Sequence, residues 1–360
     1  MKRLLYINLV IFVLAGTILG LGLYYFSFTT KKFDNQTEAN LKEAKRIFDA
    51  MPVWHKKIPT KQILKFGIAT DNHVNSSRIN SADRRPFAPR KLRSSDYAFF
   101  SKFVPQMKEF QPEFVVNLGD VVDGSSDPEP EGIIELQLVR KEMEKAGVPV
   151  KWVVGNHDLR VVSKEKFGEV LDMEAMDYTF DIGDYRFVVV DANYDRDNVP
   201  RSPDGGRYIP GHIPPQTFEW LKKQLETDKR VIVFIHQGVF ADKSRGDYSK
   251  EKQKFAYKKS INNADELQKI FDEYRVDASF NGHMEARRYE KTNRWTHCYS
   301  LTGAKKSKDY PHSYYEVTLK NGVPDVTMFY TPPGTYKEKQ VDFETDVKPN
   351  NITDLDLIKS

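Results

Sequence analysis

Six short apolar runs, rich in β-branched and aromatic residues, end abruptly in polar clusters along the middle of the chain. Segments with the apolar spacing of helices lie between several of these runs. Strands that alternate with helices predict an α/β protein with a sheet covered on both faces. The predicted strands with their polar ends span residues 63–73, 113–123, 150–158, 186–195, 230–238 and 277–285, and the predicted helices span 96–110, 133–147, 216–226 and 264–275.

The longest apolar stretch stands at the N-terminus, where no charged residue occurs from Leu4 to Thr30. A membrane-spanning helix needs about 20 apolar residues, whereas the core of a signal peptide has about 7–15. Residues 4–26 are therefore predicted to form one N-terminal transmembrane helix rather than a cleaved signal. The preceding Lys2 and Arg3 favour a cytoplasmic N-terminus, with the remainder of the chain on the extracytoplasmic side of the membrane.

These patterns predict four segments. Residues 1–30 form the membrane anchor, and residues 31–62, which have helical spacing, form a juxtamembrane helix or linker. Residues 63–335, which hold the predicted strands and the helices between them, form the main folded domain. Residues 336–360 are charged, poor in large apolar side chains, and predicted to form a polar tail.

Composition restricts the chemistry available to the chain. The 360 residues include 55 basic and 51 acidic side chains, and the net charge of +4 gives no electrostatic reason to expect nucleic acid as a partner. Cys298 is the only cysteine, which excludes an internal disulfide and a cysteine-rich zinc site. A metal ion would therefore be held by His, Asp, Glu and Asn.

The candidate metal ligands of this chain follow five of the six predicted strands. Each has an ordinary alternative, such as an aspartate that caps a turn or a histidine packed in the core. Their combination at strand ends, where α/β sheets place their ligands, favours a metal site. The candidates are Asp71, His73, Asp120, Asn156, His157, His236, His283 and Glu285.

In chain order these residues resemble the motifs of the calcineurin-like metallophosphoesterase superfamily. That pattern runs Asp-x-His, Gly-Asp-x-x-Asp, Gly-Asn-His-Asp/Glu, an isolated His, and Gly-His-x-His. The first four motifs are present, and the fifth reads Gly-His-Met-Glu from Gly282 to Glu285. The resemblance covers Phe66 to Glu285 and implies a four-layer αββα sandwich of two mixed sheets flanked by helices.

The resemblance also implies two metal ions, with manganese or iron favoured and zinc as the alternative. The implied ligands are Asp71, His73 and the bridging Asp120 for the first ion, and Asp120, Asn156, His236 and His283 for the second. Glu285 stands where the family has its last histidine. We expect its carboxylate to ligate the first ion; the alternative is a water-filled or empty position. His157 is implied to assist the leaving group, and Asp123 to orient His157.

The implied reaction is hydrolysis of a phosphodiester or phosphomonoester by in-line attack of a metal-bridging hydroxide. Gly124 replaces the arginine of the Ser/Thr protein phosphatases and argues against that branch. The order of the later segments looks like the bacterial phosphodiesterase-like branch. The implied partner is a small phosphorylated substrate, such as a nucleotide or a cyclic nucleotide.

Two questions stay open at the level of sequence. Loop 193–215 carries Arg196, Arg201, Arg207 and Tyr208. These side chains either bind the substrate or belong to a loop that is simply exposed to solvent. The competing class is a non-catalytic scaffold with a degenerate metal site. Because such a scaffold has no need of His157, its retention favours the enzyme.

Overall fold

The structure is a computed structural model that describes residues 42–46, 50–52, 54, 57–124, 128–201, 203, 211–240, 260–292, 294–305, 309–335 and 337–343. The chain divides into two compact units. One comprises Met1–Pro59 with Glu226–Lys229, and the other comprises Thr60–Leu225 with Arg230–Ser360. All predicted site residues belong to the second unit, and the following description concerns that unit alone.

The first of two six-stranded sheets has the strand order β14-β13-β12-β1-β4-β5. Neighbours β1, β4 and β5 run parallel, whereas β12, β13 and β14 extend the sheet on the other side by antiparallel pairing. The strands are β1 (Ile63–Ala69), β4 (Phe114–Asn117), β5 (Val150–Trp152), β12 (Tyr314–Lys320), β13 (Val323–Tyr330) and β14 (Lys339–Asp342).

The second sheet has the order β10-β11-β9-β8-β7-β6, with parallel pairing from β11 to β7 and an antiparallel strand at each edge. Its strands are β6 (Tyr178–Ile182), β7 (Tyr185–Val190), β8 (Arg230–Ile235), β9 (Ala278–Asn281), β10 (Arg288–Lys291) and β11 (His297–Ser300). A separate pair consists of β2 (Ser77–Arg78) and β3 (Arg90–Lys91).

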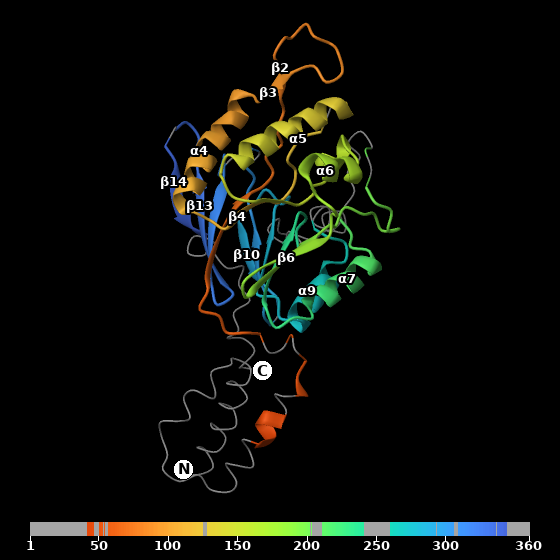
Figure 1. Cartoon of the computed structure of the whole chain (residues 1–360), viewed down its shortest axis with the longest axis vertical. Coiled ribbons are helices and arrows are strands. Elements are labelled where there is room, and N and C mark those ends of the chain that lie inside the picture. Colours follow the sequence, from red (N-terminus) through yellow and green to blue (C-terminus); the bar gives the residue numbers. More distant parts are fainter. Residues whose placement is uncertain are drawn as a thin grey trace, which may run out of the picture. The chain divides into compact units, whose positions relative to one another are not determined.

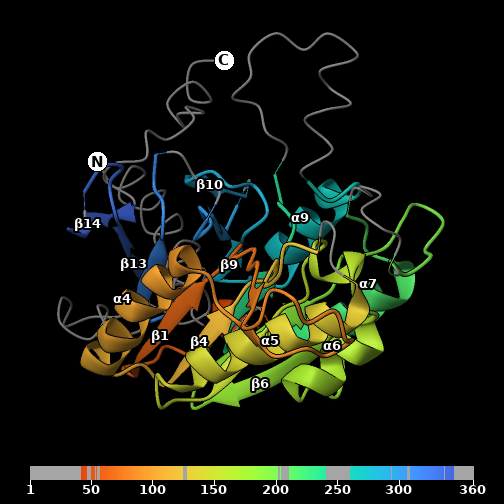
Figure 2. The same cartoon turned by 90° about the horizontal axis from the view of Figure 1, so that it is seen from above.

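Helices flank the sheets. They are α4 (Ser94–Phe110), α5 (Glu129–Glu144), the 3₁₀ turn η3 (Asp158–Arg160), α6 (Lys164–Leu171), α7 (Pro215–Leu225) and α9 (Ala264–Glu273). Figure 1 shows α4, α5 and α6 in one group and α7 beside α9 in another. Viewed from above, the first group lies on the side of β1 and β4 (Figure 2).

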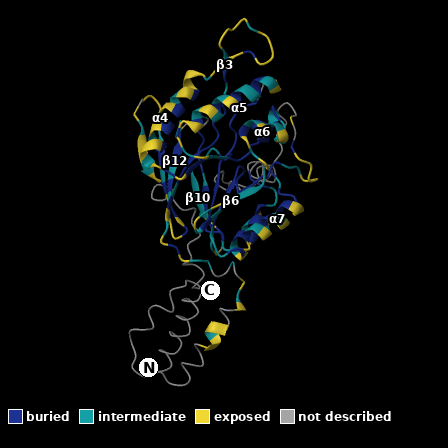
Figure 3. Cartoon of the chain, viewed as in Figure 1, coloured by how far each residue is buried: buried dark blue, intermediate teal, exposed yellow. Residues whose placement is uncertain are grey.

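The inner faces of the two sheets share an aromatic core. Phe66 of β1 stacks on Phe114 of β4 at a centroid distance of 5.2 Å. From the second sheet, Phe234 meets Phe66 edge-on at 5.6 Å, and Phe280 meets it at 5.7 Å. Since rings from both sheets interlock, the sheets pack face to face. The burial colours of Figure 3 show the central strands as buried, whereas the edge strands β6 and β10 are intermediate.

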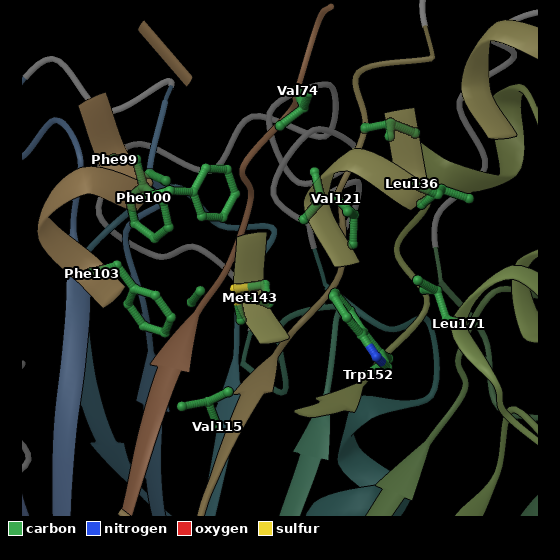
Figure 4. Close-up of a cluster of buried hydrophobic side chains, with 14 of the residues drawn as sticks. Val74, Phe99, Phe100, Phe103, Val115, Val121, Leu136, Met143, Trp152 and Leu171 are labelled. Carbon is green, nitrogen blue, oxygen red and sulfur yellow. The ribbon is translucent and has the colours of Figure 1, made fainter. Parts of the chain in front are cut away.

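A second core lies between the first sheet and helices α4, α5 and α6. In α4 the buried residues Phe99, Phe103 and Met107 recur at intervals of four, which places them on one face of the helix. They join Val115 of β4 and Leu136 of α5 in the cluster drawn in Figure 4. The helix therefore covers the sheet with the face that its sequence makes apolar.

The predicted mixed α/β architecture, with sheets flanked by helices, is confirmed. All four predicted helices form, as α4, α5, α7 and α9. The eight-residue α6 was not predicted, because its length gives too few turns for a clear apolar period. The predicted anchor at residues 1–30 lies outside the described residues, as does most of the predicted polar tail. Among the helices that the structure describes, none is long and apolar enough to cross a membrane.

Candidate metal centre

The predicted site residues follow the carboxyl ends of five strands. β1 leads to Asp71 and His73, β4 to Asp120, β5 to Asn156 and His157, β8 to His236, and β9 to His283 and Glu285. Within each sheet these strands run parallel, so their carboxyl ends share one edge. In three overlapping groups of these residues, the potential ligand atoms lie within 4.8 Å of one another. The fold thus gathers the predicted side chains at one place.

Hydrogen bonds fix the loops relative to one another. The backbone N–H of Asp71 donates to Gly119 O at 3.0 Å, and that of His73 donates to Asp120 O at 2.9 Å. The backbone N–H of His283 lies 3.1 Å from both carboxylate oxygens of Asp71. The last contact joins a loop of the second sheet directly to a loop of the first.

Five of the predicted ligands have a left-handed backbone, with φ between 44° and 59°. This conformation costs a non-glycine residue roughly 1–2 kcal/mol, and such strain concentrates at functional sites. A left-handed residue in the turn after a strand departs from the extended backbone, so its side chain no longer follows the alternation of the strand. The five are Asp71, His73, Asp120, His283 and Glu285.

Two glycines allow the loops to approach each other closely. A β-carbon at Gly155 would overlap Asp120, and one at Gly282 would overlap Thr70 and Asp71. Glycine is therefore required immediately before Asn156 and His283 if the candidate ligands are to converge.

One group of candidate ligands surrounds His73. Its Nε2 lies 3.8 Å from Asp71 Oδ1, 3.7 Å from Asp120 Oδ2 and 3.7 Å from Glu285 Oε1. These separations exceed a hydrogen bond, but two ligand atoms at about 2.1 Å from one ion lie roughly 3–4 Å apart. Both ring nitrogens of His73 are buried and have no hydrogen-bond partner among the described residues. A buried imidazole in this state is suited to hold a metal ion.

A second group surrounds His236 and shares Asp120 with the first. Nε2 of His236 lies 3.2 Å from Asp120 Oδ1 and 3.2 Å from Asn156 Oδ1. Its Nδ1 lies 2.7 Å from Leu118 O, which accepts the proton and leaves Nε2 with a lone pair for a metal. The His283 ring lies 5.1 Å from the His236 ring and completes the group.

The charges of the site favour bound cations. Burial opposes protonation of His236, but Asp120 and Asp71 outweigh it and raise the pKa of His236 to about 9. Burial also disfavours the Asp120 carboxylate, yet His236, His157 and His73 hold its pKa well below the usual range. Burial raises the pKa of Asp71, and Asp120 adds to that effect. Two buried carboxylates in one cluster of nitrogen and oxygen donors form a set that a divalent cation fits.

His157 occupies the edge of the first group. Its backbone N–H donates to Asp120 Oδ1 at 2.7 Å, and its Nε2 lies 4.0 Å from Asp120 Oδ2. Its Nδ1 lies 2.8 Å from Asp123 O and 3.3 Å from Asp123 Oδ1. Distance alone allows His157 either to ligate a metal through Nε2 or to face a substrate with it.

Comparison with known proteins identifies the family. A family model described as calcineurin-like phosphoesterase matches residues 64–284, more than half of the chain. The chain belongs to the calcineurin-like phosphoesterase family. It is accordingly a metal-dependent phosphoric ester hydrolase, and both the predicted family and the predicted enzyme class are confirmed.

Several solved structures are similar to this phosphoesterase. A dimetal phosphatase from Danio rerio is 17% identical and has a TM-score of 0.55, with 78% of this chain and 99% of that chain covered. A Thermus thermophilus protein, TT1561, is 9% identical (TM-score 0.44; coverage 78% and 100%), and a 5'-nucleotidase from Candida albicans is 14% identical (TM-score 0.39; coverage 81% and 54%). The search of curated proteins returned no match.

Three residues of the phosphoesterase site had no predicted role. Asp158 accepts hydrogen bonds from Val122 N at 3.0 Å and Gly155 N at 2.9 Å; burial and the charge of Asp120 raise its pKa to about 7. The position of Asp158 in the Gly-Asn-His-Asp motif could have identified it as a site residue. The others are Lys305, whose Nζ donates to His73 O at 2.6 Å, and Arg160, whose Nη1 lies 2.8 Å from His157 Nδ1.

The arginine-bearing loop after β7 is described only in part. Arg201 is buried, and its backbone N–H donates to Asn193 O at 2.9 Å. Arg196 is exposed and lies 3.5 Å from Asn262 Oδ1. Arg207 and Tyr208 lie outside the described residues, so a role for this loop in substrate binding stays a prediction.

Proposed function

We propose that this phosphoesterase binds two metal ions side by side and hydrolyses a small phosphorylated substrate, either a phosphodiester or a phosphomonoester. The observation that carries this proposal is the position of Asp120. Its Oδ2 lies 3.7 Å from His73 Nε2, and its Oδ1 lies 3.2 Å from His236 Nε2. The two oxygens of one carboxylate thus face two different groups of ligands, as a bridging ligand requires.

The ligand sets follow from these groups. The first ion would be held by Asp71, His73, Asp120 and Glu285, and the second by Asp120, Asn156, His236 and His283. All eight contributions are nitrogen or oxygen donors, which suits manganese, iron or zinc. Glu285 adds a carboxylate where the family pattern has a histidine, and this exchange favours the harder manganese and iron over zinc.

When bound, the two ions supply Lewis acidity and activate water for in-line attack on phosphorus. The residues of the chain then have two tasks. The ligand loops hold the substrate phosphoryl group in one orientation, and His157 faces it with Nε2 to assist the departing oxygen. Asp123 lies on the opposite side of the His157 ring, where its oxygens help to orient that ring.

We also propose that residues 4–26 anchor the enzyme in a membrane, with the phosphoesterase domain on the extracytoplasmic side. The uncharged stretch from Leu4 to Thr30 supports this proposal. Protease treatment of intact cells, followed by alkaline extraction of their membranes, tests both statements. Release of the chain by alkali would contradict the anchor, and protection from protease would contradict the orientation.

Metal stoichiometry and hydrolysis measured on one sample test the catalytic proposal. The full chain is purified without chelator, reloaded with manganese, and assayed for metal by mass spectrometry and for cleavage of bis-p-nitrophenyl phosphate and p-nitrophenyl phosphate. We expect two ions per chain, loss of activity with chelator, and recovery with manganese. Binding of only one ion per chain would show that Glu285 does not support metal binding at the first site. A folded chain that binds no ion and cleaves neither ester would overturn the proposal in favour of a scaffold.

A further inference from the structure

Strands β2 and β3 and the segment that joins them, residues 77–91, form an arm that projects beyond helices α4 and α5 (Figure 1). Hydrogen bonds continue past the two short strands. The backbone N–H of Ile79 donates to Pro89 O at 2.9 Å, and that of Asp83 donates to Asn80 O at 3.1 Å. The arm therefore has a defined backbone up to its tip.

Largely buried charges fix the base of the arm to α5. Arg90 Nη1 lies 2.5 Å from Glu131 Oε2, and the guanidinium of Arg78 pairs with the same carboxylate. Just before the arm, the backbone N–H of Ser76 donates to Glu135 Oε1 at 2.6 Å. Removal of one partner from such a pair leaves an uncompensated buried charge, so the paired arrangement is strongly preferred. The base thus holds the arm in one position relative to α5.

The arm and the start of α4 expose large apolar side chains to solvent. Ile79 is 64% exposed, Phe87 is 58% exposed, and Tyr97, near the start of α4, is 57% exposed. They are three of the six large hydrophobic residues that are exposed in the described part of the chain. Single exposed apolar side chains are ordinary, but their concentration in one segment marks an interaction surface.

The same segment carries an excess of positive charge. Residues 77–97 include six basic and two acidic side chains, an excess of four that equals the net charge of the whole chain. Of the two acids, Asp83 pairs with Arg85 at 2.8 Å, and the other is buried. Arg84 and Lys91 are exposed and form no ion pair with any described residue. Their charge is therefore available to an anionic partner.

Two hollows flank the arm where it lies against α5. The first, of about 700 Å³, lies between the arm and the start of α4, and the second, of about 510 Å³, lies on the side of α6. Neighbouring residues of α5 line different hollows, Leu138 the first and Gln137 the second, so the arm and its flanks form one continuous face. Cations and apolar groups alternate on this face, with Lys91, Arg93 and Tyr97 around the first hollow and Phe87, Ile133 and Lys141 around the second.

This combination of groups is complementary to a bilayer that contains anionic lipids. Lysine and arginine attract the phosphates of the head groups, while isoleucine and aromatic side chains enter the boundary between head groups and acyl chains. Nucleic acid would satisfy the cations but would leave Ile79 and Phe87 without apolar contacts. The proposed anchor at residues 4–26 also keeps the domain beside a bilayer, which raises the effective concentration of lipid at the arm.

We propose that the arm docks on an anionic phospholipid bilayer, with Ile79 and Phe87 in the boundary region and Arg84 and Lys91 at lipid phosphates. The inference rests on the proposed membrane anchor and extends it, because the anchor only tethers the domain, whereas the arm orients it. β2 begins four residues after His73, so no more than about 14 Å of chain separates the two. A docked arm therefore fixes the orientation of the metal centre relative to the bilayer.

Fluorescence quenching in vesicles tests the docking. A cysteine introduced at the exposed tip, Ser81→Cys, is labelled with a fluorophore in the full chain, where the natural Cys298 is buried and does not compete. The chain is reconstituted in phosphatidylcholine vesicles that carry nitroxide-labelled lipid, with or without phosphatidylglycerol. With phosphatidylglycerol we expect quenching at position 81 to be at least about threefold stronger than in Ala175→Cys, labelled at an exposed residue between α6 and β6. Equal quenching at the two positions would overturn the inference.

Substitutions separate the apolar contribution from the charged one. Ile79→Ser combined with Phe87→Ser should lower quenching at position 81 to the level at position 175, because no apolar side chain then holds the tip in the bilayer. Arg84→Gln combined with Lys91→Gln should lower it about fivefold or more in vesicles with phosphatidylglycerol, and little in pure phosphatidylcholine. Undiminished quenching in both double variants would show that the docking surface lies elsewhere.

The docking and the anchor can fail separately. Lys223→Gln combined with Lys269→Gln, which neutralises exposed lysines of α7 and α9, is the matched control and should leave quenching unchanged. If alkali releases the chain, the anchor fails, and the same labelled chain added to preformed vesicles still shows whether position 81 is quenched. An anchored chain whose tip stays unquenched would overturn the docking and leave the anchor intact. Neither measurement depends on phosphoesterase activity.

Discussion

The two ligand groups share Asp120 but are built differently. Around His236 the side chains are buried, and Leu118 O fixes the imidazole through Nδ1. Around His73 neither ring nitrogen has a hydrogen-bond partner among the described residues, and the Glu285 side chain is 27% exposed. A ligand that is oriented by an outer hydrogen bond binds its metal more tightly than one that is not. The imidazole of the second group is therefore preorganised, whereas the His73 imidazole of the first group has no outer hydrogen bond to orient it among the described residues.

Loss of the shared Asp120 carboxylate should impair metal binding by both groups. Asp120→Asn leaves neither ion with its bridging charge, so we expect kcat/KM to fall by about 10³-fold or more and both ions to be lost. Steady-state kinetics and metal analysis on the folded variant check this. Asp181→Asn, which removes an exposed carboxylate paired with Arg186, is the control and should keep both ions. Wild-type activity in Asp120→Asn would refute the bridging role.

Removal of the oriented histidine should affect one group only. In His236→Asn we expect one ion per chain in place of two, and a loss of kcat of about 10²- to 10³-fold. The remaining ion should be the weakly held one, released at lower chelator concentration than either ion of the wild type. A variant that still retains two ions would show that the second group does not depend on His236.

Changes at Glu285 should affect the first group by a smaller amount. We expect Glu285→Ala to weaken binding of the first ion by about 10- to 100-fold and to leave the second unchanged. Glu285→His should restore affinity and shift the preference from manganese toward zinc. Competition titrations with the two metals measure both effects, with the exposed Glu174→Ala as control. An unchanged metal preference in Glu285→His would count against ligation by Glu285.

The smallest effect is expected from the lysine behind His73. Lys305 Nζ donates to His73 O at 2.6 Å and lies 3.2 Å from Asp96 Oδ1, and its side chain is 30% exposed. Lys305→Met should weaken the first ion by about three- to tenfold, because a charge-assisted hydrogen bond contributes about 1.5–3 kcal/mol before solvent reduces it. Calorimetric titration checks this, with the exposed Lys320→Met as control. An equal effect on both ions would show that Lys305 does not distinguish the groups.

Much of the site could be predicted because its residues stand beside strong local signals. His236 directly follows the buried run of β8, and Asp120 follows β4 with a glycine before it, so the apolar pattern locates both at strand ends. The alternation of strands and helices also predicted that the carboxyl ends of these strands would lie close together. What the predicted strands could not specify was the division into two sheets, since that depends on pairing between distant segments such as β1 and β12.

The supporting residues could not be predicted in the same way. Lys305 lies 232 residues from His73 along the chain, and no local pattern links a lysine to a backbone carbonyl so far away. Arg160 is only three residues from His157, but its contact with His157 Nδ1 depends on a 3₁₀ turn and on the absence of a side chain at Gly124. Contacts of this kind arise from packing, which short-range periodicity does not report.

The left-handed backbone at five candidate ligands also restricts how this enzyme can change in evolution. Asparagine adopts that conformation more easily than most residues, and the codons of both aspartate and histidine are one base away from it. At Asp71 or Asp120 the mildest substitution for the fold is thus one that replaces a charged ligand by a neutral amide. Mutations that accumulate at these positions would therefore abolish the activity more readily than they would unfold the protein. We expect inactive descendants of such a chain to stay folded and to be available for new roles as binding proteins.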